Sequence, residues 1–109
     1  MAEPTLQQVF GSNASQTEFE LVIKKSDLAA IGLSALVENT AEALFAAIIA
    51  HAQQTLSETS KESNPDQSVI IEDGLPSLTT REDTTYRQQL KSITFEKPDT
   101  QSNFDPDDY

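Results

Sequence analysis

The longest stretch of the chain with a single hydrophobic period runs from Asn39 to Leu56. Its apolar residues recur every three or four positions, which places side chains on one face of an amphipathic helix. We therefore expect a long helix over about residues 40–57, with Asn39 as its N-cap and Glu42 completing a capping box. The face expected to pack on the core consists of Ala41, Leu44, Phe45, Ile48, Ile49, Ala52 and Leu56.

This helix is expected to supply most of the hydrophobic core. Burying a large apolar side chain contributes roughly 1.5–3 kcal/mol, and chain entropy offsets most of the sum. We therefore predict that Phe45→Ala or Ile48→Ala lowers the free energy of unfolding by about 3–5 kcal/mol. The large side chains concerned are Leu44, Phe45, Ile48, Ile49 and Leu56.

The other side of the same helix carries alanines where a solvent-facing surface usually carries charged residues. Alanine is a strong helix former, so these positions can simply be a stable exposed surface. The alternative is that small side chains let a second element approach closely, from the same chain or from a second copy. This possible interface comprises Ala43, Ala46, Ala47 and Ala50.

Three short elements are expected before the central helix. Pro4 suits the first position of a helix and Gly11 the position after its end, which predicts a helix over residues 4–10. Apolar and charged residues alternate over 17–24, as in a strand with one buried face. A short helical turn is expected over 28–31.

After the central helix, residues 57–67 lack large apolar side chains and are expected to form an exposed connector. The β-branched run within 68–73 predicts a buried strand. Residues 77–85 are mostly polar and are expected to form a connection or a twisted sheet edge. Residues 86–95 fit either a strand with a bulge or a helix, and their β-branched and aromatic residues favour the strand.

The C-terminal residues are acidic and poor in apolar side chains, so a mobile tail is expected over 98–109. Residues 1–97 are then one small domain. The expected fold class is α+β: a small, partly antiparallel sheet of about three strands packed on one long helix, with a short N-terminal helix and the mobile tail. One helix covers only one face of such a sheet.

The uncovered face is expected to expose Val22 and Ile70. An exposed apolar face usually marks a contact surface, so a homo-oligomer is expected, most simply a two-fold dimer. The competing arrangement is a monomer in which the N-terminal helix folds back over this face.

The chain carries 18 acidic and 7 basic residues, a formal net charge of −11. Such a charge repels phosphate backbones and anionic lipid surfaces, so neither nucleic acid nor a membrane is an expected partner. There is no cysteine, which excludes disulfides and zinc-thiolate sites. No secretory signal is evident at the N-terminus, and a cytoplasmic protein is expected.

Candidate chemistry is sparse. The single histidine, His51, lies at the border of the apolar arc, and no carboxylate follows or precedes it by one helical turn. The three glycines are scattered, so there is no phosphate-binding loop. Asp105, Asp107 and Asp108 resemble only a fragment of a calcium loop. We therefore expect no catalytic residue, no metal and no cofactor.

Two functional hypotheses remain. The first is a non-enzymatic interaction or structural protein, a small homo-oligomer that contacts a protein partner. The second is a small-ligand-binding or enzymatic domain with a pocket between helix and sheet, near His51 and Tyr86. Solution mass and ligand-dependent titration of His51 distinguish them.

Overall fold

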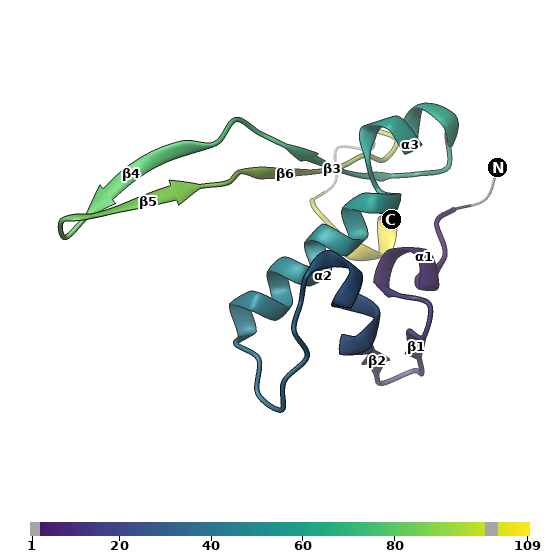
Figure 1. The fold of residues 1–109 in the computed structure, drawn as a ribbon. Helices are drawn as coiled ribbons and strands as arrows, with labels where there is room; N and C mark the ends of the chain where they lie inside the picture. Colours follow the sequence, from purple (N-terminus) through teal and green to yellow (C-terminus); the bar gives the residue numbers. More distant parts are fainter. Residues whose placement is uncertain (1–2, 100–102) are drawn as a thin grey trace.

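A computed structural model describes residues 3–99 and 103–109 of the chain. It confirms the α+β class: a small helical body carries a long two-stranded ribbon that projects to one side (Figure 1). The elements in chain order are α1 (Leu6–Phe10), β1 (Ser15–Gln16), β2 (Leu21–Val22), η1 (Lys25–Ile31), α2 (Ala41–Thr55), α3 (Glu58–Ser63), β3 (Val69–Asp73), β4 (Ser77–Arg81), β5 (Thr84–Gln88), β6 (Lys91–Phe95) and η2 (Pro106–Asp108).

The expected long helix is α2, but its cap differs from the prediction. Thr40 is the N-cap, and its hydroxyl accepts a hydrogen bond from the amide of Ala43 at 3.1 Å. Asn39 instead accepts from the amide of Leu36 at 3.1 Å and so closes the loop before the helix. Glu42 remains in the first turn, where its charge favours the positive end of the helix dipole.

The buried surface of α2 includes Ala52 and Leu56 of the predicted arc but departs from that arc at other positions, such as the exposed Ala41. Phe45 is 67% exposed, so its predicted place in the core is wrong. Ala47, expected on the opposite arc, is buried. The reason is that α2 contacts α1, η1 and β3, so its covered surface is wider than one stripe. The core cluster is Ala52, Leu56 and Ile71, with Val9, Ile49 and Val69 packed against it.

The strands pair two by two rather than in one three-stranded sheet. Within residues 3–99 the pairs are β1 with β2, β3 with β6, and β4 with β5, all antiparallel. The predicted strand 68–73 is confirmed as β3, whereas 17–24 contributes only the short β2. Residues 86–95 are extended, as favoured, and divide into β5 and β6.

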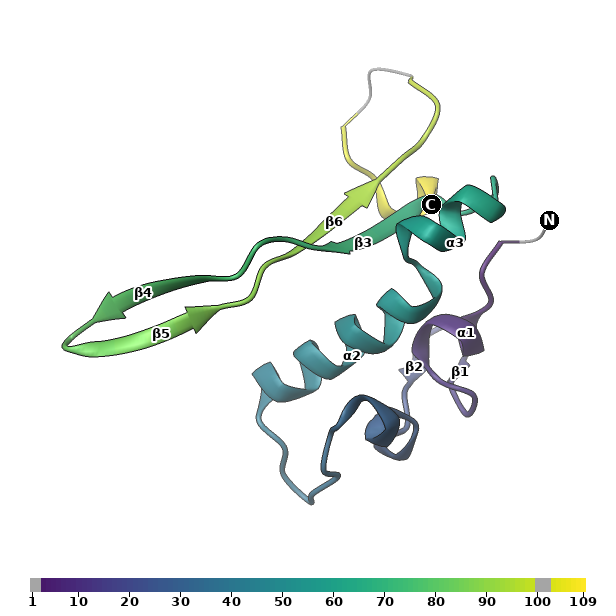
Figure 2. The same ribbon diagram turned by 45° about the horizontal axis from the view of Figure 1, so that its top comes forward.

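The β4–β5 hairpin continues the β3–β6 pair outward, and we call residues 74–90 the arm. Both views show it extending away from the helices (Figures 1 and 2). Its tip is a two-residue turn between the paired Arg81 and Thr84. Glu82 and Asp83 have φ values of 49° and 65°, the left-handed pair of a type I′ hairpin turn. The expected polar connection 77–85 is therefore half of a hairpin.

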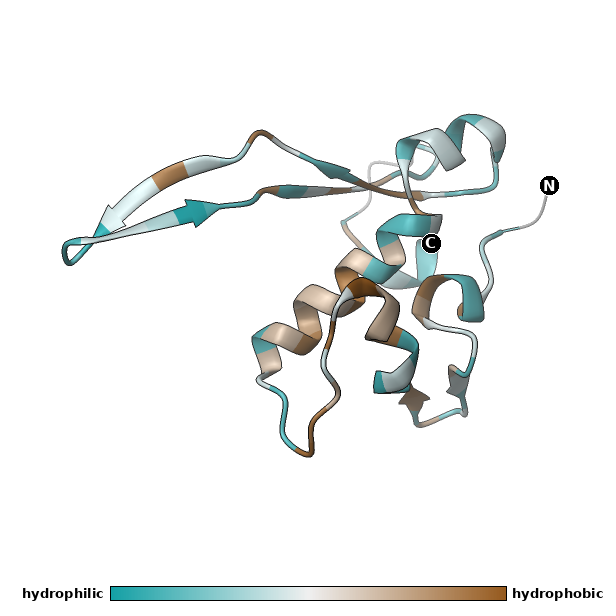
Figure 3. Ribbon diagram, viewed as in Figure 1, coloured by the Kyte–Doolittle hydropathy of each residue, from teal (hydrophilic) through white to brown (hydrophobic). Residues whose placement is uncertain are grey.

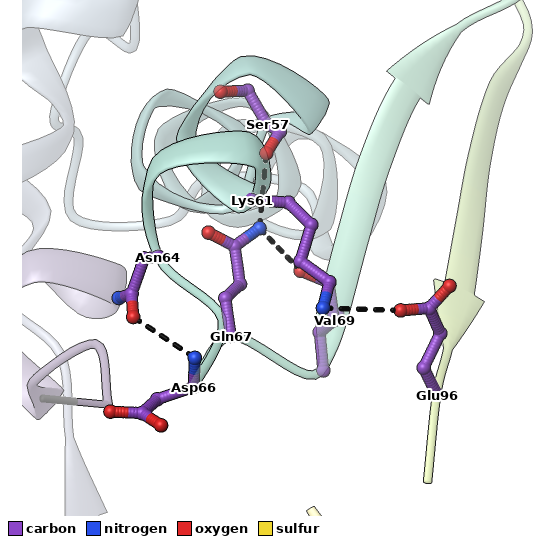
Figure 4. A network of polar contacts seen from close by, with 7 residues as sticks. All are labelled: Ser57, Lys61, Asn64, Asp66, Gln67, Val69 and Glu96. Atoms are coloured by element: carbon purple, nitrogen blue, oxygen red, sulfur yellow. Dashed lines mark hydrogen bonds and ion pairs between the residues drawn. The ribbon is translucent and has the colours of Figure 1, made fainter. Parts of the chain in front are cut away.

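The predicted connector 57–67 contains the short helix α3, capped by the Ser57 hydroxyl. Gln67 is buried at its end. The side-chain amide of Gln67 donates to the carbonyls of Ser57 at 3.0 Å and Val69 at 2.9 Å, as Figure 4 shows. Lys61 of α3 pairs with Glu96 at 3.4 Å. These contacts join the end of α2 to both strands at the base of the ribbon.

The C-terminal segment contacts β6. Rings of Phe95, Phe104 and Tyr109 pack together with centroid separations of 5.1–5.6 Å. The Lys97 ammonium lies 2.8 Å from the Asp108 carboxylate, which raises the pKa of that lysine above its ordinary 10.5. The mobility expected for 98–109 stays a prediction, and part of that range, residues 100–102, lies outside the described residues.

Candidate functional site

The two residues of the predicted ligand site lie in different parts of the molecule. His51 is half-buried in α2, and its Nδ1 lies 3.0 Å from the carbonyl oxygen of Val9. Tyr86 lies on β5, where the Arg81 guanidinium sits 4.5 Å from the centre of its ring. Because the arm projects away from the helices, the structure does not bring the two together (Figure 1).

The contact made by His51 links two helices. A carbonyl oxygen only accepts hydrogen bonds, so Nδ1 must carry the proton. Beside it, the Thr55 hydroxyl donates to the carbonyl of Gln8 at 2.9 Å. These two bonds fasten α1 to α2, and His51 acts as a positioning residue for the N-terminal helix.

Two features are absent from the part of the chain that the structure describes. No group of three metal-ligating side chains occurs there, and no helix is long and apolar enough to cross a membrane. The Asp105 carboxylate caps the amide of Asp107, while Asp108 pairs with Lys97. Asp105 thus caps the short helix η2, and Asp108 fastens that helix to Lys97, which follows β6.

An apolar groove does lie between helix and ribbon, at a different place from the predicted pocket. It encloses about 460 Å³. Apolar side chains from α1, α2, β3 and β6 form most of its lining, among them Phe10, Ile48 and Ile93. Its acidic lining residues are Glu3 and Asp66. Neither His51 nor Tyr86 lines it, so the groove depends on contacts between distant segments that the sequence pattern did not reveal.

The arm is the second notable surface, because its leucines have no cover. Leu75 is 90% exposed, Leu78 64% and Leu90 58%. Leu78 pairs directly with Arg87 across the strands, so both side chains share one face. Arg81 and Tyr86 occupy the opposite face, where they contact each other. Figure 3 shows isolated hydrophobic positions on an otherwise hydrophilic arm.

The arm and the rest of the chain also differ in net charge. Residues 74–90 contain two acidic and two basic side chains, whereas the remainder of the chain contains 16 acidic and 5 basic ones. The arm is therefore neutral and carries its acids only at the tip. A negative body and a neutral, arginine-bearing arm favour contacts between unlike parts of two molecules over contacts between two bodies.

The base of the arm is fastened to α2 through Lys91. Its ammonium lies 2.7 Å from the Asp73 carboxylate and donates to the Gln53 side chain at 2.6 Å. The hydrogen bond from Lys91, and a second one from the Gln53 side-chain amide at 3.3 Å, lower the pKa of Asp73 below its ordinary 3.8, with Lys91 as the larger cause. The direction in which the arm leaves the body is therefore set by polar contacts at its root.

The residues predicted as an interface do not form one surface. Ala43 and Ala46 are exposed and Ala50 is half-buried, whereas Ala47 is buried within the chain. Val22 is exposed on β2.

Ile70 is buried, so its expected place on an uncovered sheet face is wrong. The physical reason is that both α2 and α3 contact β3 and cover it. Sequence reasoning missed the arm leucines because the threonine-rich stretch around them looked like a loop.

Comparison of this chain with protein-family models, with curated proteins and with solved structures finds no match. The groove and the arm are therefore the two features of the molecule from which a function can be inferred.

Proposed function

We propose that this chain is a non-enzymatic interaction protein that associates through its arm, most simply as a homodimer. The observation that carries the proposal is the exposure of Leu75, Leu78 and Leu90 on a projecting ribbon. Isolated two-stranded ribbons are marginally stable in water. Covering the three leucines contributes roughly 5–9 kcal/mol before the cost of association, which is enough to favour a complex.

The absence of clustered reactive groups supports an interaction role over catalysis. The histidine is engaged by a backbone carbonyl, and no metal-ligating cluster occurs in residues 3–99 and 103–109. Exposed apolar side chains also occur near the start of α2, at Leu36, Val37 and Phe45. A further protein partner that covers this second surface is part of the proposal.

The test is the solution mass of the full chain and of a variant with a shortened arm. Replacing residues 74–90 by Asn-Gly makes the paired Asp73 and Lys91 the flanks of a two-residue turn, so the β3–β6 pair is kept. We expect light scattering to give about twice 12.0 kDa for the full chain and a monomer for the variant. A monomeric full chain, or a shortened variant that keeps the doubled mass, contradicts the proposal.

A second candidate function, binding of a small apolar molecule, is favoured by the groove itself. A volume of about 460 Å³ with a mostly apolar lining falls within the range of ligand pockets. The test is the fluorescence of N-phenyl-1-naphthylamine, a neutral apolar probe, on titration with the full chain. Enhancement that Ile93→Trp abolishes, and the matched arm variant Leu90→Trp does not, supports this candidate.

A further inference from the structure

We propose that two copies of this chain join along the outer edges of their β5 strands, antiparallel and with Tyr86 on the two-fold axis, so that the two arms form one four-stranded sheet. This inference rests on the proposed function and names the surface through which the arms associate. The contact consists mainly of main-chain hydrogen bonds. It therefore requires an edge of β5 that is open and that fits a second copy of itself.

The ribbon has two edges, and the edge formed by β3 and β4 is protected. The amide of Ile71 in β3 donates to the carbonyl of Leu56 at 2.7 Å, so the end of α2 occupies that part of the edge. Between β3 and β4, residues 74–76 lie opposite only residues 89–90, which makes a bulge. Pro76 within this bulge has no N–H to donate. Bulges and prolines are devices by which proteins prevent an edge strand from pairing with another chain.

The outer edge of β5 is open. The two-residue turn makes Arg81 and Thr84 a hydrogen-bonded pair, and hydrogen-bonded and non-hydrogen-bonded pairs alternate from there. The amides and carbonyls of Thr85 and Arg87 therefore point away from β4. Within residues 3–99 and 103–109, no backbone hydrogen bond from outside the β4–β5 pair reaches β5, and all of its residues are exposed. Such an edge is a template for a further strand.

The alternation limits the registers in which two β5 edges can pair, because outward groups must meet outward groups. Pairing Thr85 with Arg87 of the second copy places Tyr86 on the axis and matches all 5 residues of β5. An axis at Arg87 would set two guanidinium groups directly opposite each other, which is unfavourable. An axis at Thr85 would leave Arg87 and Gln88 opposite the turn. The register centred on Tyr86 is therefore the favoured one.

The side chains of β5 are self-complementary in this register. Tyr86 meets Tyr86 of the second copy, and aromatic cross-strand pairs are favourable. Arg87 lies beside Thr85 of the second copy and diagonal to its Asp83, which brings each guanidinium near a carboxylate. The turn of each arm lies beside Leu90 of the other copy and covers a side chain that is 58% exposed in the single chain. Every contact forms twice, as an isologous interface requires.

The arrangement also keeps the two negative bodies apart. The arm is neutral, whereas the whole chain has a net charge of −11. Because each arm extends away from its helices (Figure 2), antiparallel pairing leaves one body at each end of the joined sheet. Repulsion between the bodies is therefore weaker than in a contact between the bodies themselves.

The first experiment blocks one edge at a time and measures the dimer dissociation constant by sedimentation equilibrium. Thr85→Pro removes an outward N–H of β5 at two symmetry-related positions, so it should weaken association by at least about tenfold. Thr80→Pro is the matched control, because Thr80 pairs with Thr85 across the hairpin and its N–H points outward from β4. It should change the constant by less than about threefold. Thermal unfolding of both variants checks that the fold is intact.

Cysteine cross-linking tests the register independently. The chain has no cysteine, so Tyr86→Cys and Thr79→Cys each introduce a single thiol. Residues on the proposed axis form a non-hydrogen-bonded pair with Cα atoms about 4.5 Å apart, which a disulfide can bridge. Thr79 is directly across the hairpin from Tyr86, so in the joined sheet it lies one strand further from the axis.

We expect mild oxidation to convert Tyr86→Cys into a covalent dimer on a denaturing, non-reducing gel and to leave Thr79→Cys monomeric. Cross-linking of Thr79→Cys instead would mean that the β4 edges meet, and it would overturn the inference. Failure of both variants to cross-link, or equal cross-linking of both, would overturn it as well.

The outcomes also separate this inference from the proposed function. If the shortened arm gives a monomer but Thr85→Pro associates as tightly as the wild type, the arm joins elsewhere and only the inference is overturned. Equal weakening by both proline variants has the same meaning. If arm shortening leaves the dimer unchanged, the proposed function fails too.

Discussion

The body and the arm are each stabilised by different interactions. In the body, burial of Ala52, Leu56 and Ile71 by the helices and β3 supplies the driving force. In the arm, every residue of β5 is exposed and only Thr79 of β4 is partly covered. The arm keeps its shape through backbone pairing, a tight turn and the Arg81–Tyr86 contact. Buried side chains thus stabilise the body, whereas the exposed side chains that another molecule could contact lie on the arm.

The largest expected effect belongs to the body. Ile71→Ala removes a buried side chain from the core and should lower the free energy of unfolding by about 2–5 kcal/mol in urea titrations. Phe45→Ala, a larger truncation at an exposed position, should cost less than about 1 kcal/mol. Equal losses for the two variants would mean that Phe45 packs in the core, as the sequence pattern predicts.

A smaller effect is expected where the N-terminal loop meets η1. Gly11 has φ of +121°, and a Cβ there would lie 2.6 Å from the Cβ of Asp27. Gly11→Ala should therefore cost about 1–3 kcal/mol of stability, measured by urea unfolding. Gly32→Ala is the matched control, because Gly32 also has positive φ but open space around it. A cost at position 11 no greater than at position 32 would contradict the close contact.

The contact at Asp27 should also make the stability of the body depend on pH. The amide and side chain of Asn13 donate to the Asp27 carboxylate at 2.8 and 2.7 Å and hold its pKa below the ordinary 3.8. A depressed pKa gives a contribution that is complete above 3.8 and is lost as the pH falls through the lower value.

Wild type and Asp27→Asn should thus differ in melting temperature above about pH 4 and converge at lower pH. Parallel pH profiles for the two proteins would show that the carboxylate has no special interaction in the folded state.

The smallest global effect is expected at the tip of the arm. Glu82 and Asp83 adopt left-handed conformations that Asn and Gly adopt more readily. Glu82→Asn with Asp83→Gly should slow hydrogen exchange of the arm amides several-fold and leave the melting temperature of the body unchanged. If the double variant slowed hydrogen exchange in the arm and also raised the melting temperature of the body, the arm and the body would unfold as one unit.

The sequence predicted the elements whose pattern is local and strong. The period of residues 40–57 and the β-branched run 68–73 correspond to α2 and β3. Gly11 follows the end of α1 as predicted, but the helix begins at Leu6 after the N-cap Thr5 rather than at Pro4. The burial of Ala47 escaped prediction because alanine fits both a surface and a close contact.

The arm escaped prediction because its strands are exposed on both faces and lack a buried alternation. Its turn, Glu-Asp, is also not a common hairpin dipeptide. The groove could not be predicted from local patterns at all, since α1, α2 and the ribbon converge only through long-range contacts.

The bonds that fasten α1 to α2 bear on the order in which the chain can fold during synthesis. Gln8 and Val9 find their partners at Thr55 and His51, more than forty residues later in the chain. The N-terminal helix therefore emerges from the ribosome long before the surface that covers it. The β3–β6 ribbon, by contrast, closes as a local hairpin once its last strand is made. We expect nascent chains truncated before residue 56 to expose α1 to chaperones and proteases.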